Sequence, residues 1–251
     1  MHHAQYCDAL AGEAVRLAEL VADPAAQAEP VPTCPGWVVA DVVDHVGTLY
    51  YWSSAHVATG ARARLDARSL ELDQPEDGAT PEWFAKAIDP MIGIFRGCDP
   101  DASVWGWGAD RHARFWPRRM LFETVVHSAD ASFALGVDPD IDAGVAADGI
   151  DELLSNLPHA AYFAPNIAEL RGDDERVAFR AVDRDSSWSI RLVPAGYAWD
   201  WSDRSADVTV SGRASDLLLL LYRRRSADDA GRFERAGDLA LLDRFLAHTQ
   251  L

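Results

Sequence analysis

Arg119-Met-Leu-Phe-Glu-Thr-Val-Val-His-Ser-Ala-Asp130 is the stretch from which the fold and chemistry of the first half of the chain can be argued. Glu123 and His127 are four residues apart. On an α-helix both side chains therefore project from one face, one turn apart. A helix here presents a carboxylate and an imidazole together.

A second histidine lies far upstream in an apolar setting. His45 stands among Val42, Val46 and Leu49 at helical spacing, so it should point toward a core rather than toward water. Two imidazoles and one carboxylate then meet between helices. Two histidines and a glutamate with a fourth position open are typical of catalytic zinc, although such a site also suits non-haem iron. The sequence therefore predicts a metal site made of His45, Glu123 and His127.

Composition narrows the class of protein. The 251 residues, 49% of them hydrophobic, suffice for one large domain or two modest ones. A formal charge of −17 would repel phosphate backbones and anionic lipid surfaces, which argues against nucleic acid and membrane partners. Three scattered cysteines without CxxC spacing, and no long apolar segment or signal-peptide core, predict a cytoplasmic protein.

The first half of the chain predicts a helical bundle. Apolar periodicity and capping residues indicate helices over 3–21, 36–58, 81–97 and 117–136, with Pro90 bending or dividing the third. Residues 98–116 are too irregular for a helix and rich in aromatic side chains, so they could form a wall or lid over a pocket. Four such helices suit a bundle, whose core commonly holds metal sites.

After Gly136 the sequence pattern changes from helical periodicity to a mixture of helical and alternating segments. A connector over 137–144 precedes a helix near 146–157, and alternating segments at 176–182 and 188–193 predict a hairpin. Further strands are expected at 197–201 and 207–210, and helices at 214–224 and 238–248. The predicted fold class is therefore α + (α+β), with a four-helix bundle over residues 1–140 and a small α+β domain over 141–251.

Several segments occur in an order that resembles one known family. The motifs are Val31-Pro-Thr-Cys-Pro-Gly-Trp37, Val43-Asp-His-Val-Gly47, Glu123-Thr-Val-Val-His127 followed by Asp130-Ala131, Ala206 to Asp216, Leu217 to Leu221 with Arg224, and Gly237 to Phe245. Together they resemble the mycothiol-dependent maleylpyruvate isomerase family over nearly the whole chain. The resemblance implies a DinB-like metal-binding bundle, a C-terminal sterol-carrier-like domain and an actinobacterial source.

The resemblance also implies cofactors and site residues. It implies a zinc ion, or another divalent metal, on the residues matching His45, Glu123 and His127, with water or the thiol of mycothiol at the open position. It further implies a catalytic arginine in the C-terminal domain, for which Arg224 is the best match, although Arg223 and Arg225 flank it. Where many members carry arginine after the second metal histidine, this chain has Ser128.

Three functions are compatible with a metal site made of His45, Glu123 and His127. Zinc can remove the proton of a bound thiol. In the isomerase reaction that thiolate adds to a cis unsaturated diketo acid, and after bond rotation it leaves to give the trans isomer. The same thiolate could open an epoxide or another small-molecule electrophile, which would make the protein a mycothiol S-transferase. A binding or regulatory protein with an idle metal is the third possibility.

The individual residues also have simpler interpretations. An isolated His45 is more often a core histidine, and Glu123 with His127 can be an ordinary pair on a solvated helix face. Asp130 could orient a ligand or be a surface or packing residue, and Cys34 a packing residue rather than a nucleophile. The sequence leaves open a monomer or a homodimer.

Overall fold

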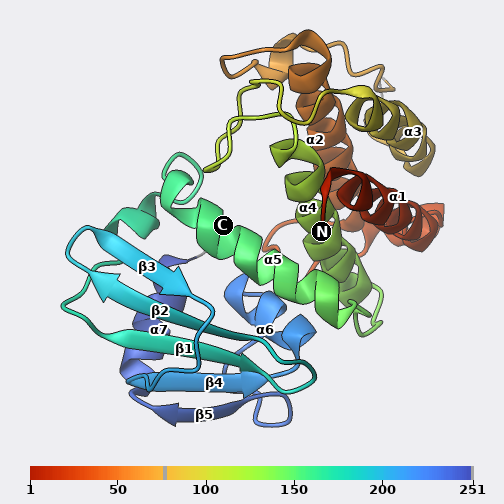
Figure 1. Ribbon diagram of the computed structural model, residues 1–251. Coiled ribbons are helices and arrows are strands. Elements are labelled where there is room, and N and C mark those ends of the chain that lie inside the picture. The colour runs from red at the N-terminus through yellow and green to blue at the C-terminus, as the bar shows by residue number, and fades with distance from the viewer. Residues whose placement is uncertain (76–77, 250–251) are drawn as a thin grey trace. The chain divides into compact units, whose positions relative to one another are not determined.

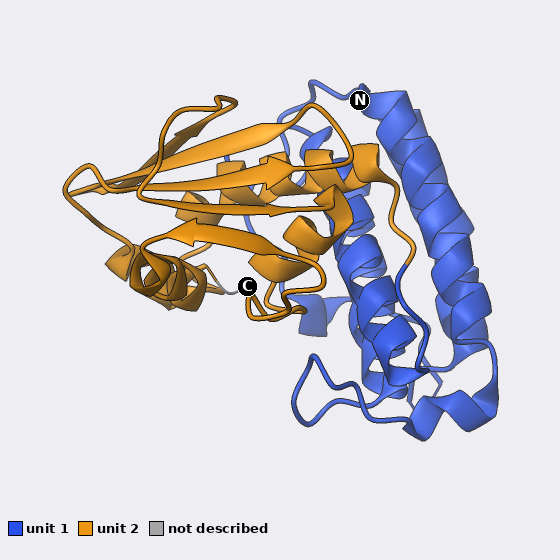
Figure 2. Ribbon diagram, turned by 90° about the horizontal axis from the view of Figure 1, so that it is seen from below, with its two compact units in different colours: residues 1–139 blue, residues 140–251 orange. Residues whose placement is uncertain are grey.

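The computed structural model describes residues 1–75 and 78–249 (Figure 1). The chain divides into two compact units, residues 1–139 and residues 140–251 (Figure 2). Each unit is described by itself below. None of the helices in the described part of the chain has the length and apolar character of a membrane span.

Unit 1 is a helical bundle, as predicted. Its described residues form four α-helices, α1 (His3–Leu20), α2 (Val39–Thr59), α3 (Pro81–Gly97) and α4 (Phe115–Ala134), with short 3-10 helices η1 (Pro24–Ala28) and η2 (Ala67–Ser69). Helix α4 packs against α1 and α2, and α3 packs against the same two helices. The helix with the predicted Glu and His thus lies beside the helix with His45.

Helix α4 has well-defined ends. The predicted start at Pro117 is two residues too late, because the helix begins at Phe115 and proline is tolerated anywhere in a first turn, where no N–H partner is needed. Past Ala134, Gly136 adopts a φ of +71°. The amides of Gly136 and Val137 bond to Phe133 O (3.2 Å) and Ser132 O (2.8 Å). This is a Schellman motif, which confirms the predicted stop at Gly136.

The third helix is one continuous element. Thr80 Oγ1 accepts a hydrogen bond from Trp83 N at 3.1 Å, which caps the N-terminus of α3. Pro90 lies inside α3 without dividing it, so of the two predicted alternatives, a bend or a division, the division is wrong. Burial of one apolar face, which includes Phe84, Ile88 and Phe95, compensates for the hydrogen bond that proline removes.

The second helix begins later than predicted. Residues 36 and 37 belong to a compact loop, and α2 starts at Val39. The amide of Val31 donates to Trp37 O at 2.9 Å, and the amide of Trp37 donates to Cys34 O at 3.0 Å. Gly36 completes the turn with a φ of +86°, a conformation that glycine adopts without strain. This loop fixes the position of Trp37 ahead of the helix.

The aromatic segment before α4 contributes to the core. Trp105 and Trp116 pack around His56 with ring centroids 4.9 and 5.3 Å away, and Trp52 joins them. His56 is fully buried, its Nδ1 donates to Trp52 O at 2.8 Å, and its Nε2 accepts from Leu65 N at 3.0 Å. Trp116 is fully buried and Trp105 is half-buried, so both are packed side chains of this aromatic cluster, and the lid interpretation is wrong for them.

His56 gives the stability of the protein a pH dependence. Burial lowers the pKa of His56, and Arg64 lowers it further. As the pH falls below about 6.5, the unfolded chain binds a proton that the folded chain does not, so the free energy of unfolding decreases. We expect His56→Gln to be less stable at pH 7 and to lose less stability than the wild type between pH 7 and 5. Urea unfolding across that range measures both, and parallel curves would contradict the prediction.

Unit 2 combines a sheet with helices. Its described part contains α5 (Ala143–Asn156), α6 (Ala214–Leu221), α7 (Leu239–His248) and the short 3-10 helices η3 (Leu157–His159) and η4 (Pro165–Glu169). The strands are β1 (Arg176–Ala181), β2 (Ser187–Val193), β3 (Gly196–Asp200), β4 (Val208–Gly212) and β5 (Glu234–Gly237), in the order β3-β2-β1-β4-β5 (Figure 1). Strands β1 and β4 are parallel, and the other pairs are antiparallel.

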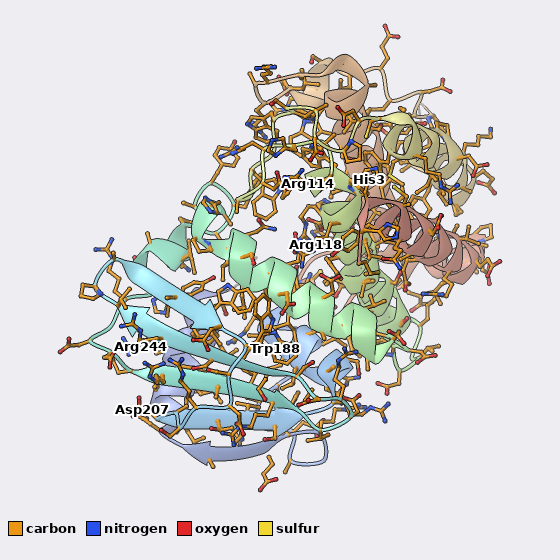
Figure 3. All side chains as sticks on the ribbon, viewed as in Figure 1. His3, Arg114, Arg118, Trp188, Asp207 and Arg244 are labelled. Atoms are coloured by element: carbon orange, nitrogen blue, oxygen red, sulfur yellow. The ribbon has the colours of Figure 1, made fainter. Side chains whose placement is uncertain are left out.

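The sheet packs on its helices through large aromatic side chains. Phe179 and Trp188 are opposite each other in the β1–β2 register, so they share one face of the sheet. Phe179 contacts Phe245 of α7, with ring centroids 5.8 Å apart. Trp188, labelled in Figure 3, donates from Nε1 to Asp151 of α5 at 2.6 Å. Helices α5 and α7 therefore cover the same face.

Helix α6 ends earlier than predicted. It stops at Leu221 rather than near Arg224, because Arg223 takes the left-handed conformation with a φ of +63°. The amides of Arg223 and Arg224 bond to Leu220 O and Leu219 O in a Schellman motif. The three arginines therefore lie in a loop after the helix.

Glycine should suit position 223 better than arginine. A side chain in the left-handed region costs about 1 kcal/mol or more, so we expect Arg223→Gly to raise the melting temperature by about 2–4 °C. Thermal unfolding checks this. Arg213→Gly is the control, because Arg213 has an ordinary φ of −63° and glycine there should give no gain. An equal or lower melting temperature for Arg223→Gly would contradict the account.

Candidate metal centre

The three predicted ligands meet between α2 and α4. His45, Glu123 and His127 each offer a ligand atom, and these atoms all lie within 4.8 Å of one another. His127 Nε2 is 3.6 Å from Glu123 Oε2, and the rings of His45 and His127 are 4.8 Å apart between centroids. Two ligands of a tetrahedral ion at 2.0–2.1 Å lie about 3.3 Å apart. Two imidazoles and a carboxylate at this spacing fit zinc.

The burial of these groups suits a site with an open side. His127 is 6% exposed, the Glu123 side chain is 24% exposed, and His45 is half-buried. Burial and the neighbouring His127 lower the pKa of His45 to about 4. His45 is therefore a neutral imidazole at neutral pH, which is the form that binds metals.

Asp130 holds the histidine on α4 from behind. It is fully buried, and its Oδ2 accepts a hydrogen bond from His127 Nδ1 at 2.9 Å. Its Oδ1 accepts from Thr33 Oγ1 at 2.6 Å, and its Oδ2 also accepts from Cys34 Sγ at 3.4 Å. The sequence left several roles open for Asp130. This geometry agrees with one of them, a buried acceptor that orients His127. With Nδ1 engaged, Nε2 is the nitrogen left for a metal.

A second group of possible ligands shares His127. Ligand atoms of Cys34, His127 and Asp130 also lie within 4.8 Å of one another. In that group the hydrogen bonds already use the carboxylate of Asp130 and Nδ1 of His127. A metal there would displace the bonds that join the 30–38 loop to α4, so the His45, Glu123 and His127 group is the better candidate.

Trp37 covers the two histidines. Its ring stacks on His127 with centroids 5.9 Å apart and planes at 14°, and it lies 5.2 Å from the ring of His45. The sequence shows that Trp37 follows Pro35-Gly36, but only the folded loop shows that its ring reaches His45 and His127.

A small pocket opens beside His45. Its volume is about 280 Å³, and its lining residues are Trp37, Asp41, Asp44, His45, Thr48 and Leu49. The lining thus combines an aromatic face with two carboxylates. Such a pocket can admit a small molecule to the side of His45, and it favours neutral or cationic groups over anions.

The predicted catalytic arginine belongs to unit 2. Arg224 Nη1 donates to Tyr222 O at 2.8 Å, and the side chain is half-buried. Of its neighbours, Arg225 forms an ion pair with buried Asp216, with Nε and Oδ1 2.8 Å apart, and Arg223 is exposed. Arg225 is thus tied to a buried carboxylate, and Arg224 stays the predicted catalytic residue.

Two family profiles match the chain. Residues 9–132 match the mycothiol maleylpyruvate isomerase N-terminal domain, and residues 144–244 match the C-terminal domain of the same enzyme family. A search of curated protein sequences found no match.

Solved structures support the same fold. The crystal structure of a mycothiol-dependent maleylpyruvate isomerase with a histidine-to-alanine mutation is 13% identical, with a TM-score of 0.60, over 94% of this chain and 93% of that one. A second crystal structure of a mycothiol-dependent maleylpyruvate isomerase is 13% identical with the same coverages and a TM-score of 0.57. At this identity the likeness concerns the fold.

Proposed function

The chain belongs to the mycothiol-dependent maleylpyruvate isomerase family, and we propose that it is a zinc enzyme that activates mycothiol for addition to a small electrophilic substrate. The observation that carries this proposal is the convergence of His45, Glu123 and His127 beside a pocket. Isomerisation of maleylpyruvate, or of a related cis unsaturated diketo acid, is the preferred reaction.

In this proposal each residue has a defined task. His45, Glu123 and His127 hold the metal, and Asp130 keeps His127 in the tautomer whose Nε2 faces it. Trp37 shields the histidines from water. Zinc held there would lower the pKa of a bound thiol, and the reversible addition of that thiol to a conjugated double bond would permit rotation without net consumption of the thiol. Arg224 is the proposed partner of the substrate's negative charge.

A thiol transferase is the second candidate, and the pocket favours it. The pocket beside His45 contains Asp41 and Asp44, which would disfavour a substrate that carries carboxylates at that position. An uncharged electrophile such as an epoxide would meet no such repulsion. In that reaction the sulfur forms a lasting bond to carbon, and the opened oxygen takes up a proton.

One assay distinguishes the candidates. Zinc-loaded protein is given mycothiol with maleylpyruvate, and in parallel mycothiol with an epoxide. The isomerase proposal expects cis-to-trans conversion while the thiol concentration stays constant. Stoichiometric loss of thiol with formation of an S-conjugate would indicate the transferase. Turnover of neither substrate would favour a binding or regulatory protein that keeps the fold.

A further inference from the structure

A buried arginine lies directly beside the proposed metal ligands. Arg119 is one helical turn before Glu123 on α4 and is only 1% exposed. A guanidinium at such depth is costly unless a negative partner compensates for its lost hydration. Its Nη2 is 3.2 Å from Oε1 of Glu123, which supplies that partner.

The two oxygens of Glu123 face different groups. Oε1 pairs with Arg119, whereas Oε2 is 3.6 Å from His127 Nε2, on the side where the metal ligands converge. A carboxylate can bind a metal through one oxygen or through both. With Oε1 paired to the guanidinium, Oε2 is the oxygen that faces His127 and the other proposed metal ligands.

The guanidinium is itself held in place. Its central carbon lies 5.6 Å from the centre of the Trp107 ring, within the range of a cation–π contact. Trp107 in turn packs edge-on against Phe115 at the start of α4, with ring centroids 5.7 Å apart. The contacts of Arg119 therefore restrict it to the position from which it reaches Glu123.

We propose that Arg119 is a positioning residue that makes Glu123 a one-oxygen ligand and so preserves an open coordination position for the thiol. This rests on the proposed function, because it needs a metal at His45, Glu123 and His127. A second oxygen from Glu123 would occupy the position that the sulfur needs. By drawing charge from the carboxylate, Arg119 also leaves the metal more strongly electrophilic toward the thiol.

Cobalt(II) tests the proposal, since its visible absorption is stronger in four-coordinate than in five- or six-coordinate sites. We expect Arg119→Met to weaken these bands, because Glu123 can then bind the metal through both oxygens and raise its coordination number. Arg119→Gln keeps an N–H donor for Oε1 and should retain the wild-type spectrum. Trp107→Leu removes the cation–π contact that helps to hold Arg119 but keeps the Arg119–Glu123 ion pair, so it should weaken the bands much less than Arg119→Met does.

The outcomes separate this inference from the proposed function. A folded Arg119→Met that binds cobalt with the wild-type spectrum would overturn the positioning role while leaving the metal site intact. If Arg119→Met does not fold, a folded Arg119→Gln with an altered spectrum would overturn it instead. A wild-type protein that binds no cobalt would remove the proposed function, and this inference with it. Equal spectral changes in Trp107→Leu and Arg119→Met would indicate a packing role only.

Discussion

Replacing His127 by alanine is expected to abolish zinc binding and thiol-dependent turnover. The change removes a proposed ligand, Nε2, and also the group that Asp130 holds through Nδ1. Loss of an outer partner alone commonly costs about 10–100-fold in metal affinity, so loss of the ligand itself should cost more than about 100-fold. Elemental analysis of untagged protein measures the result, with near-stoichiometric zinc expected in the wild type.

Two further ligand variants and one negative control lie on unit 1 with His127. His45→Ala and Glu123→Ala should lose zinc as His127→Ala does, because each removes one of the three ligands. His112→Ala is the negative control, since His112 pairs with Asp110 and takes no part in the site. It should keep its zinc. Full zinc occupancy in any of the three ligand variants would contradict the assignment.

Asp130→Ala is expected to reduce both zinc affinity and stability. The fully buried carboxylate accepts hydrogen bonds from Thr33, Cys34 and His127, and alanine would leave these donors unsatisfied. We expect a loss of about 2–4 kcal/mol in the free energy of unfolding, from donors that cost about 1–3 kcal/mol each and that water partly satisfies. Zinc affinity should fall by about 10–100-fold. Urea unfolding and chelator competition measure the two effects.

Thr33→Val separates the two effects. It removes one hydrogen bond to Oδ1 of Asp130 and leaves the bond between Oδ2 and His127 in place. The expected loss is about 1 kcal/mol of stability, with zinc affinity unchanged. If Asp130→Ala and Thr33→Val lowered zinc affinity equally, Asp130 would serve only to fasten the loop, and its orienting role would be wrong.

Local spacing accounts for the part of the site that could be predicted. Glu123 and His127 share a helix face because they are four residues apart, and this needs no knowledge of other elements. The bundle also follows from periodicity and caps, such as Thr80 and Gly136. Glu123 and His127 meet His45 only because α2 packs against α4. The ligand chemistry of the three residues suggested this packing, and the structure shows it.

The missed features depend on contacts between distant residues. Trp37 reaches the histidines only because a loop folds back on itself, and the role of Arg119 depends on the direction in which Glu123 is turned. Strand β5 is short and polar, so it has no apolar alternation, and its pairing with β4 defines it. Helix α6 ends because φ becomes positive at Arg223. Arginine rarely adopts this conformation, so the residue type did not indicate the end of the helix.

The most direct test of the central claim is zinc X-ray absorption on the protein before and after addition of mycothiol. The account predicts a first shell of nitrogen and oxygen atoms in the thiol-free protein and one added zinc–sulfur distance of about 2.3 Å after mycothiol binds. The thiol-free spectrum also controls for Cys34, which would contribute sulfur before any mycothiol is added. A shell that contains no sulfur after saturation with mycothiol would contradict thiol activation by the metal.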